Sequence, residues 1–170
     1  MMMQKLFRHM TRVLALTLSL VFAVPAAMAS AEPYDHEEAR NLTIVRNGME
    51  AWRDGTGGII DSLADDATWD ITGNAVTSRI YTSKEDFLAN AIRPFNARLS
   101  TPLVPTTVRD LYADGDTVVA FFDAEATARD GLSYRNTYAW FLTFRDGRIV
   151  KAASFFDPIA FNDLWQRISP

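Results

Sequence analysis

Residues 117–156 read TVVAFFDAEATARDGLSYRNTYAWFLTFRDGRIVKAASFF, and this stretch decides the fold. Three segments rich in Val, Phe, Tyr, Ala and Thr are separated by two copies of Arg-Asp-Gly, at residues 129–131 and 145–147. Asp-Gly between such segments is a strong signal for a β-hairpin. A further Asp-Gly at 114–115 follows another extended segment that begins at Thr106. The sequence therefore predicts an antiparallel meander.

Outward from the meander, the chain alternates helical and extended patterns. The stretch 35–54 has an apolar stripe at helical spacing, and a short helix is expected over 57–63. A strand over 64–72 follows. Ser83 begins a third helix with a capping pattern, and Pro94 is expected to interfere with it. A last short helix is expected over 158–167. Three helices ahead of a long sheet predict an α+β fold, with the helices on one face of the sheet.

The N-terminus has the layout of a secretory signal peptide. Three basic residues precede an apolar run from Val13 to Val24, and small residues follow it. The run is shorter than the roughly 20 residues of a membrane-spanning helix, so a retained anchor is the weaker interpretation. Cleavage is expected after Ala29, at the end of Ala27-Met28-Ala29, and Ala29-Ser30-Ala31 offers a second frame. We therefore expect a signal peptide over residues 1–29, a single domain over 30–170, and a periplasmic or secreted protein.

Composition excludes several classes of function. The chain has no cysteine and a formal net charge of −4, and no basic run follows the N-terminal segment. Neither disulfides nor thiolate chemistry is available, and nucleic-acid binding is not expected. His36 is the only histidine beyond residue 29. A Ser-His or Cys-His pair and a histidine-rich metal site are therefore not expected either.

The segment around residues 134–140 raises the question of function. In an extended strand Tyr134, Asn136, Tyr138 and Trp140 share one face. A buried amide without partners costs about 1–3 kcal/mol, so Asn136 must bond its neighbours or a ligand. Two interpretations stay open: an aromatic core with internal hydrogen bonds, or the wall of a ligand pocket.

The order of elements, with LADDATWDITG at 63–73, the Asp-Gly turns and GRIVKAASFFD at 147–157, resembles the SnoaL-like group of the nuclear transport factor 2-like superfamily. The resemblance covers residues 35–168. It implies a cone-shaped α+β fold in which three helices from the N-terminal half pack on the concave face of a curved antiparallel sheet. It also implies one deep, largely apolar pocket.

Side chains from several strands are expected to face that pocket by the same resemblance. The substrate-binding candidates are Trp69, Ile71, Asn136, Tyr138, Trp140, Ser154 and Phe156. Asp123 lies on a strand with apolar residues on both faces. A catalytic acid or base in the pocket is one interpretation of Asp123, and a solvent-exposed group or surface ion pair is the other.

The named chemistries of the group do not transfer. Relative to ketosteroid isomerases, the base position falls on Ile71 and the oxyanion aspartate position on Trp140. Relative to limonene epoxide hydrolases, Asp123 matches the first aspartate, but the second falls on Ser154 and the arginine on Phe121. Asp157, before Pro158, is read as a helix cap, with an acid role as the alternative.

We therefore expect an exported domain that binds a small, mostly apolar molecule. In the enzymatic form, Asp123 drives proton transfer or water addition without a cofactor or metal. The alternative is a non-catalytic ligand-binding or dimerisation module, with a homodimer formed through the open face of the sheet. No nucleic acid is expected as a partner, and no membrane after signal cleavage.

Overall fold

The computed structural model describes residues 34–169, so the expected signal peptide lies outside the described residues. The helical elements are α1 (His36–Arg53), η1 (Ile59–Ser62), α2 (Lys84–Phe87), η2 (Leu88–Ile92), α3 (Arg93–Asn96) and α4 (Pro158–Arg167). The strands are β1 (Leu63–Ile71), β2 (Ile80–Tyr81), β3 (Val104–Asp114), β4 (Thr117–Thr127), β5 (Ser133–Arg145) and β6 (Arg148–Phe156). Within this range, no helix combines the length and the apolar character needed to cross a membrane.

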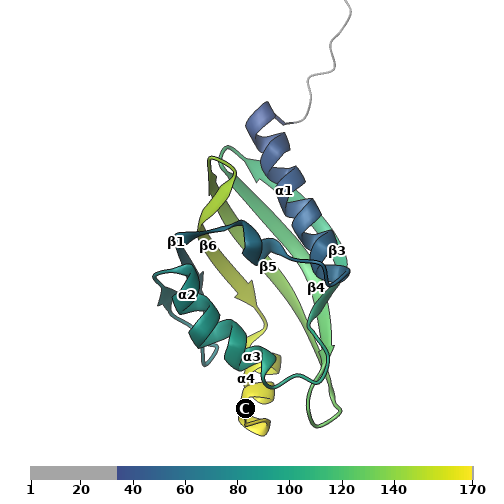
Figure 1. The fold of residues 1–170 in the computed structure, drawn as a ribbon. Coiled ribbons are helices and arrows are strands. Elements are labelled where there is room, and N and C mark those ends of the chain that lie inside the picture. Colours follow the sequence, from purple (N-terminus) through teal and green to yellow (C-terminus); the bar gives the residue numbers. More distant parts are fainter. Residues whose placement is uncertain (1–33, 170) are drawn as a thin grey trace, which may run out of the picture. The chain divides into compact units, whose positions relative to one another are not determined.

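The strands form one curved, six-stranded sheet in the order β2-β1-β6-β5-β4-β3 (Figure 1). The antiparallel meander from β3 to β6 is confirmed. The sheet is not antiparallel throughout, because β1 runs parallel to β6, with Trp69 opposite Ala152 and Ile71 opposite Ser154. Local turn signals predict hairpins, whereas this pairing joins strands distant in the sequence and leaves no local signal.

The β5–β6 hairpin has a two-residue loop, Asp146-Gly147, between the paired residues Arg145 and Arg148. Both loop residues have positive φ, at 53° and 75°. That is the signature of the type I′ turn, whose twist matches the strands and which Asp-Gly favours. The turn fixes the register, so alternate side chains of β5 from Tyr134 to Phe144 are buried.

Helix α1 begins with a complete capping box in which Asp35 and Glu38 exchange hydrogen bonds with each other's backbone N–H groups. The segments α2, η2 and α3 follow one another without a break from Lys84 to Asn96. Pro94 does not end this helical segment. Because its ring would collide with the carbonyl four residues earlier, the turn before it widens into the π-helix η2.

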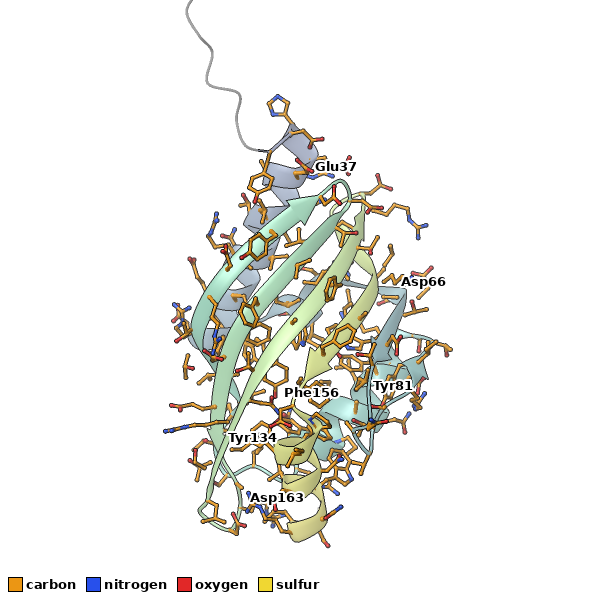
Figure 2. All side chains as sticks on the ribbon, turned by 180° about the vertical axis from the view of Figure 1, so that it is seen from behind. Glu37, Asp66, Tyr81, Tyr134, Phe156 and Asp163 are labelled. Carbon is orange, nitrogen blue, oxygen red and sulfur yellow. The ribbon has the colours of Figure 1, made fainter. Side chains whose placement is uncertain are left out.

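All of these helices lie on the inner, concave face of the sheet (Figure 1). Apolar residues of α1 pack against β3 and β4, and Phe87 of α2 packs on Trp69 of β1. Helix α4 closes one end, capped by Asp157, whose carboxylate accepts from Ile159 N at 2.8 Å. Figure 2, seen from behind, looks onto the outer face of β3 to β6. The helices and the inner face of the sheet therefore enclose the aromatic core.

Candidate ligand pocket

A cavity of about 640 Å3 remains between the inner face of the sheet and the helices. Side chains of β1, β5 and β6 line one side of this central cavity, and α2, η2 and α3 line the other. Its mouth lies between the segment 57–61 and the segment 99–103, where several lining residues are exposed. The volume falls within the range typical of small-molecule sites.

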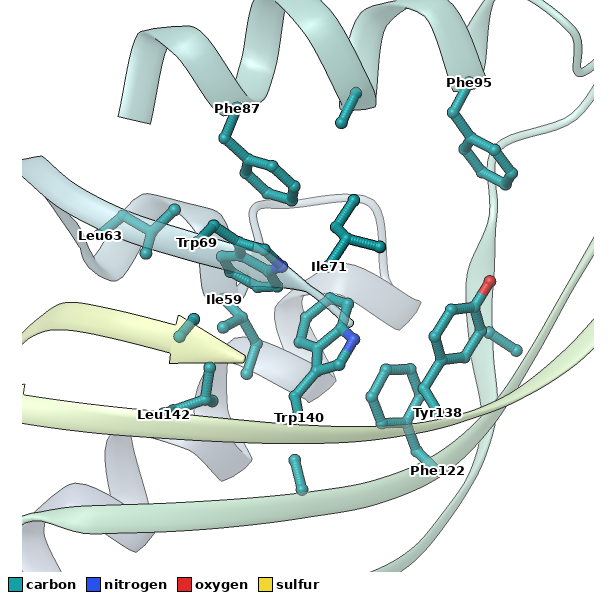
Figure 3. Packing of buried hydrophobic residues seen from close by; sticks show 14 of the residues in the cluster. Ile59, Leu63, Trp69, Ile71, Phe87, Phe95, Phe122, Tyr138, Trp140 and Leu142 are labelled. Carbon is teal, nitrogen blue, oxygen red and sulfur yellow. The ribbon is translucent and has the colours of Figure 1, made fainter. Parts of the chain in front are cut away.

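The walls are built from aromatic rings that support one another (Figure 3). Trp69 stacks on Phe87 with ring centroids 4.3 Å apart and meets Trp140 edge-on at 5.0 Å. Trp52 stacks on Trp140 at 5.6 Å, and its indole N–H donates to Leu103 O at the mouth. Rings locked at these angles hold their positions without a ligand, so the cavity is preformed.

Six of the seven predicted substrate-binding residues line the central cavity: Trp69, Ile71, Tyr138, Trp140, Ser154 and Phe156. Ser154 is already engaged, because its hydroxyl accepts from Trp69 Nε1 at 3.0 Å and lies 3.4 Å from Asp70 O. It therefore fixes the Trp69 ring. Phe156 is half-buried and packs on Tyr138 and on Phe161 of α4.

Asn136 is buried but does not line the central cavity. Its Oδ1 accepts from the backbone N–H groups of Thr137 and Asp157, at 2.8 and 2.9 Å. Its Nδ2 donates to Asp157 O at 2.9 Å and to the Tyr134 hydroxyl at 3.1 Å. Every part of the amide is thus satisfied inside the protein, and Asn136 ties the end of β6 and the start of α4 to β5.

Two residues of β5 that line the cavity carry a polar group: Trp140 has its indole N–H, and Tyr138 has its hydroxyl. The Tyr138 hydroxyl lies 2.9 Å from the Tyr134 hydroxyl, which is buried outside the cavity lining. Burial raises the pKa of Tyr138 well above its ordinary value, so the phenol is neutral at physiological pH. In Figure 3 this hydroxyl points toward the side of the cavity where Phe95 lies.

Asp123 lies on the outer face of the sheet, so it does not face the cavity as its catalytic interpretation required. Phe122 and its buried neighbours on β4 take the inward positions. The carboxylate of Asp123 bonds Arg109 Nε at 2.7 Å and accepts from Thr137 Oγ1 at 2.6 Å. The Arg109 bond first, and the Thr137 bond second, hold the pKa of Asp123 below its ordinary value. The alternative interpretation, a surface ion pair, matches this geometry.

Sequence reasoning missed the half of the lining that the helices and the β1–β2 loop contribute. The additional apolar members are Trp52, Ile59, Ile60, Phe87, Ala91, Ile92, Phe95, Leu99, Pro102, Leu103 and Phe161. Trp52 belongs to the apolar stripe of the helix predicted over residues 35–54, and that pattern predicts a core residue but does not indicate a cavity wall. Thr77 lines the cavity, and its buried hydroxyl has no hydrogen-bond partner among residues 34–169. No local pattern marks such a loop residue.

The part of the cavity lining that the structure describes carries almost no charge. Among the described lining residues, Asp61 is the one with a charged side chain; it lies at the exposed mouth, where its carboxylate accepts from Gly58 N at 2.8 Å. Within residues 34–169, no cluster of three or more His, Cys, Asp or Glu side chains is placed to hold a metal ion. The arrangement suits an uncharged apolar molecule, which exchanges water for aromatic walls.

The fold and the site together define a class of protein: an α+β domain in which a curved sheet and its helices surround an apolar cavity. Residues 45–152 match the family model described as the SnoaL-like domain. The chain belongs to this family, within the nuclear transport factor 2-like superfamily. No protein of curated function matches the chain significantly.

Solved structures share the fold at low sequence identity. Bal32a, from a soil-derived mobile gene cassette, is 19% identical with a TM-score of 0.63, over 76% of this chain and 98% of that protein. A putative isomerase from Bacillus subtilis is 17% identical with a TM-score of 0.62, over 79% and 99%. TerC, co-crystallized with polyporic acid, is 21% identical with a TM-score of 0.58, over 75% and 98%. These likenesses extend to the fold alone.

Proposed function

We propose that the protein is an exported binding protein for a small, uncharged and mostly apolar molecule, held in the central cavity. The observation that carries the proposal is the cavity of about 640 Å3, with preformed aromatic walls and, among residues 34–169, a single charged lining residue that lies at the mouth. Export rests on the basic and apolar pattern of residues 1–29. The periplasm or the exterior is the compartment that this pattern implies.

The same geometry favours binding over proton-transfer catalysis. A general base must reach the proton that it removes, to about 3 Å or through one water. Asp123 is on the other side of the sheet, and Asp61 is exposed at the mouth. Tyr138 keeps its proton because burial raises its pKa. TerC and the putative isomerase share the fold, and the co-crystallization of TerC with polyporic acid supports a small-molecule role for this fold.

The direct test is native mass spectrometry of protein recovered from the periplasm. We expect a mass excess that disappears on denaturation, together with an N-terminus at residue 30 or, in the second cleavage frame, at residue 32. Ile92→Trp fills the cavity from η2 and should abolish the excess. Ile80→Trp is the matched control, because Ile80 is 60% exposed on β2. If the wild-type protein is never recovered with a bound molecule, the proposal is contradicted.

A second candidate function, assembly as a homodimer, is favoured by the outer face of the sheet. Register places Phe121 of β4, Ala139 of β5 and Phe155 of β6 side by side, with Phe141 next to them. Phe141 and Phe155 are 40% and 50% exposed and meet edge-on at 5.8 Å. This outer patch therefore brings exposed aromatic side chains together on one face, which is typical of an interaction surface. We propose that a second copy of the chain covers it.

Sedimentation velocity tests the dimer. Wild-type protein should sediment as a dimer, and Phe141→Glu should sediment as a monomer, because the carboxylate would be buried without a partner. Ile159→Glu is the control, since Ile159 is 79% exposed on α4 and does not belong to the outer patch. A monomeric wild-type protein at micromolar concentration would refute this candidate and leave the ligand proposal untouched.

A further inference from the structure

The orientation of the Asn136 amide is determined by its partners. Its Oδ1 accepts from two backbone N–H groups, Thr137 N and Asp157 N, which cannot accept a hydrogen bond in return. A flipped amide would place two NH2 hydrogens against those donors. The NH2 group therefore lies on the other side, where it donates to Asp157 O and to the Tyr134 hydroxyl oxygen.

This donor decides where the phenolic protons of Tyr134 and Tyr138 go. Tyr134 is buried, and its hydroxyl has two polar neighbours among the described residues, Asn136 Nδ2 and the Tyr138 hydroxyl. If Tyr138 donated to Tyr134, the Tyr134 proton would be buried without an acceptor. If Tyr134 donates to Tyr138, the O–H bond of Tyr138 is free to point into the cavity that Tyr138 lines. Only the second arrangement leaves the free proton at the cavity, where a ligand can accept it, instead of burying it on Tyr134 without an acceptor.

We propose that Asn136, Tyr134 and Tyr138 form a one-way hydrogen-bond relay that makes the Tyr138 O–H a donor to the ligand. This deepens the proposed function and rests on it. The ligand class is an uncharged molecule whose polar end is a hydrogen-bond acceptor, such as a carbonyl oxygen. Tyr138 is the specificity-determining contact, and Tyr134 and Asn136 are positioning residues that act through it.

The indole N–H of Trp140 also supports the acceptor class. Three tryptophans line the cavity. The indole N–H of Trp69 donates to Ser154 Oγ, and that of Trp52 donates to Leu103 O. Trp140 has no acceptor for its indole N–H among the described residues, and its ring borders Tyr138 in the lining. An N–H and an O–H donor thus face one cavity. Donors in series polarise each other, which strengthens the last bond of the relay.

The test compares two probes with one carbon skeleton, 9-fluorenone and fluorene, which differ by the carbonyl oxygen. Their three fused rings are small for a cavity of about 640 Å3. Isothermal titration calorimetry should give the wild-type protein a preference of about 2- to 12-fold for 9-fluorenone. Tyr138→Phe keeps the ring and should remove the preference. Tyr134→Phe should reduce it, and Tyr112→Phe, at an exposed site on β3, should leave it unchanged.

Infrared spectroscopy of bound 9-fluorenone separates a donor role from a packing role. The carbonyl stretch should move to lower frequency in the wild-type protein, return to its apolar-solvent value in Tyr138→Phe and lie between the two in Tyr134→Phe. If a variant fails to fold, an unshifted carbonyl stretch in the wild-type protein still overturns the proposal. Equal binding of both probes, or a shift that persists in Tyr138→Phe, overturns the relay while the binding function stands. Failure of both probes to bind overturns the proposed function and the relay with it.

Discussion

Asn136→Ala is the sharpest test of how β5 holds the end of the sheet. The amide makes four hydrogen bonds, to Thr137 N, to Asp157 N and O and to the Tyr134 hydroxyl. The Thr137 bond joins adjacent residues, and water can replace it. The other three bridge β5 to the β6–α4 junction or satisfy the buried Tyr134. At about 1 kcal/mol for each, with a penalty for groups left unsatisfied, the loss is about 2–4 kcal/mol.

Equilibrium unfolding in urea measures this loss as a lower midpoint at unchanged slope. Asn162→Ala is the matched control, because Asn162 also bridges two backbone groups, Val76 N and Asn74 O, but in an exposed setting. It should lose less than about 1 kcal/mol. If Asn136→Ala were as stable as Asn162→Ala, the assignment of Asn136 as the anchor of α4 would be refuted.

Three further outcomes follow from individual contacts. The pKa of Asp123 is lowered in the folded state, so its contribution to stability is present above the ordinary aspartate pKa and is lost as the pH falls through the folded value. Asp123→Asn should therefore lose stability at neutral pH, match the wild type in strong acid and bind ligand normally, as urea unfolding across pH and calorimetry can check. Ser154→Ala leaves the buried Trp69 N–H without its acceptor and should cost about 1–3 kcal/mol in thermal unfolding. Asp157→Ala removes the cap of α4 and should cost about 1 kcal/mol, with Asp157→Ser near the wild type, measured in the same way.

Features that depend on neighbours in the sequence could be predicted from it. Alternation along 134–140 placed four side chains on one face, and the structure buries all four. On β4 the same rule could not choose a face, because Phe121 and Phe122 are both large and apolar. The choice depends on what lies opposite: Phe122 stacks on Tyr138 at 5.1 Å and meets Trp140 at 5.0 Å, which places Asp123 outside.

Features that depend on distant segments could not be predicted in this way. The polar groups of Asn136 pair with backbone 21 residues away at Asp157, so its role as an anchor appears only after folding. The parallel pairing of β1 with β6 has the same origin. The central cavity is a property of spacing between layers, which no strand or helix pattern contains.

The positions of the tryptophans allow intrinsic fluorescence to report whether the cavity is occupied. Of four in the chain, Trp52, Trp69 and Trp140 border the central cavity, whereas Trp165 lies outside its lining beneath the Arg98 guanidinium. A ligand that excludes water from the first three will change both the wavelength and the intensity of their emission, while Trp165 serves as an internal reference. Occupancy can therefore be followed by ultraviolet fluorescence in unlabelled protein.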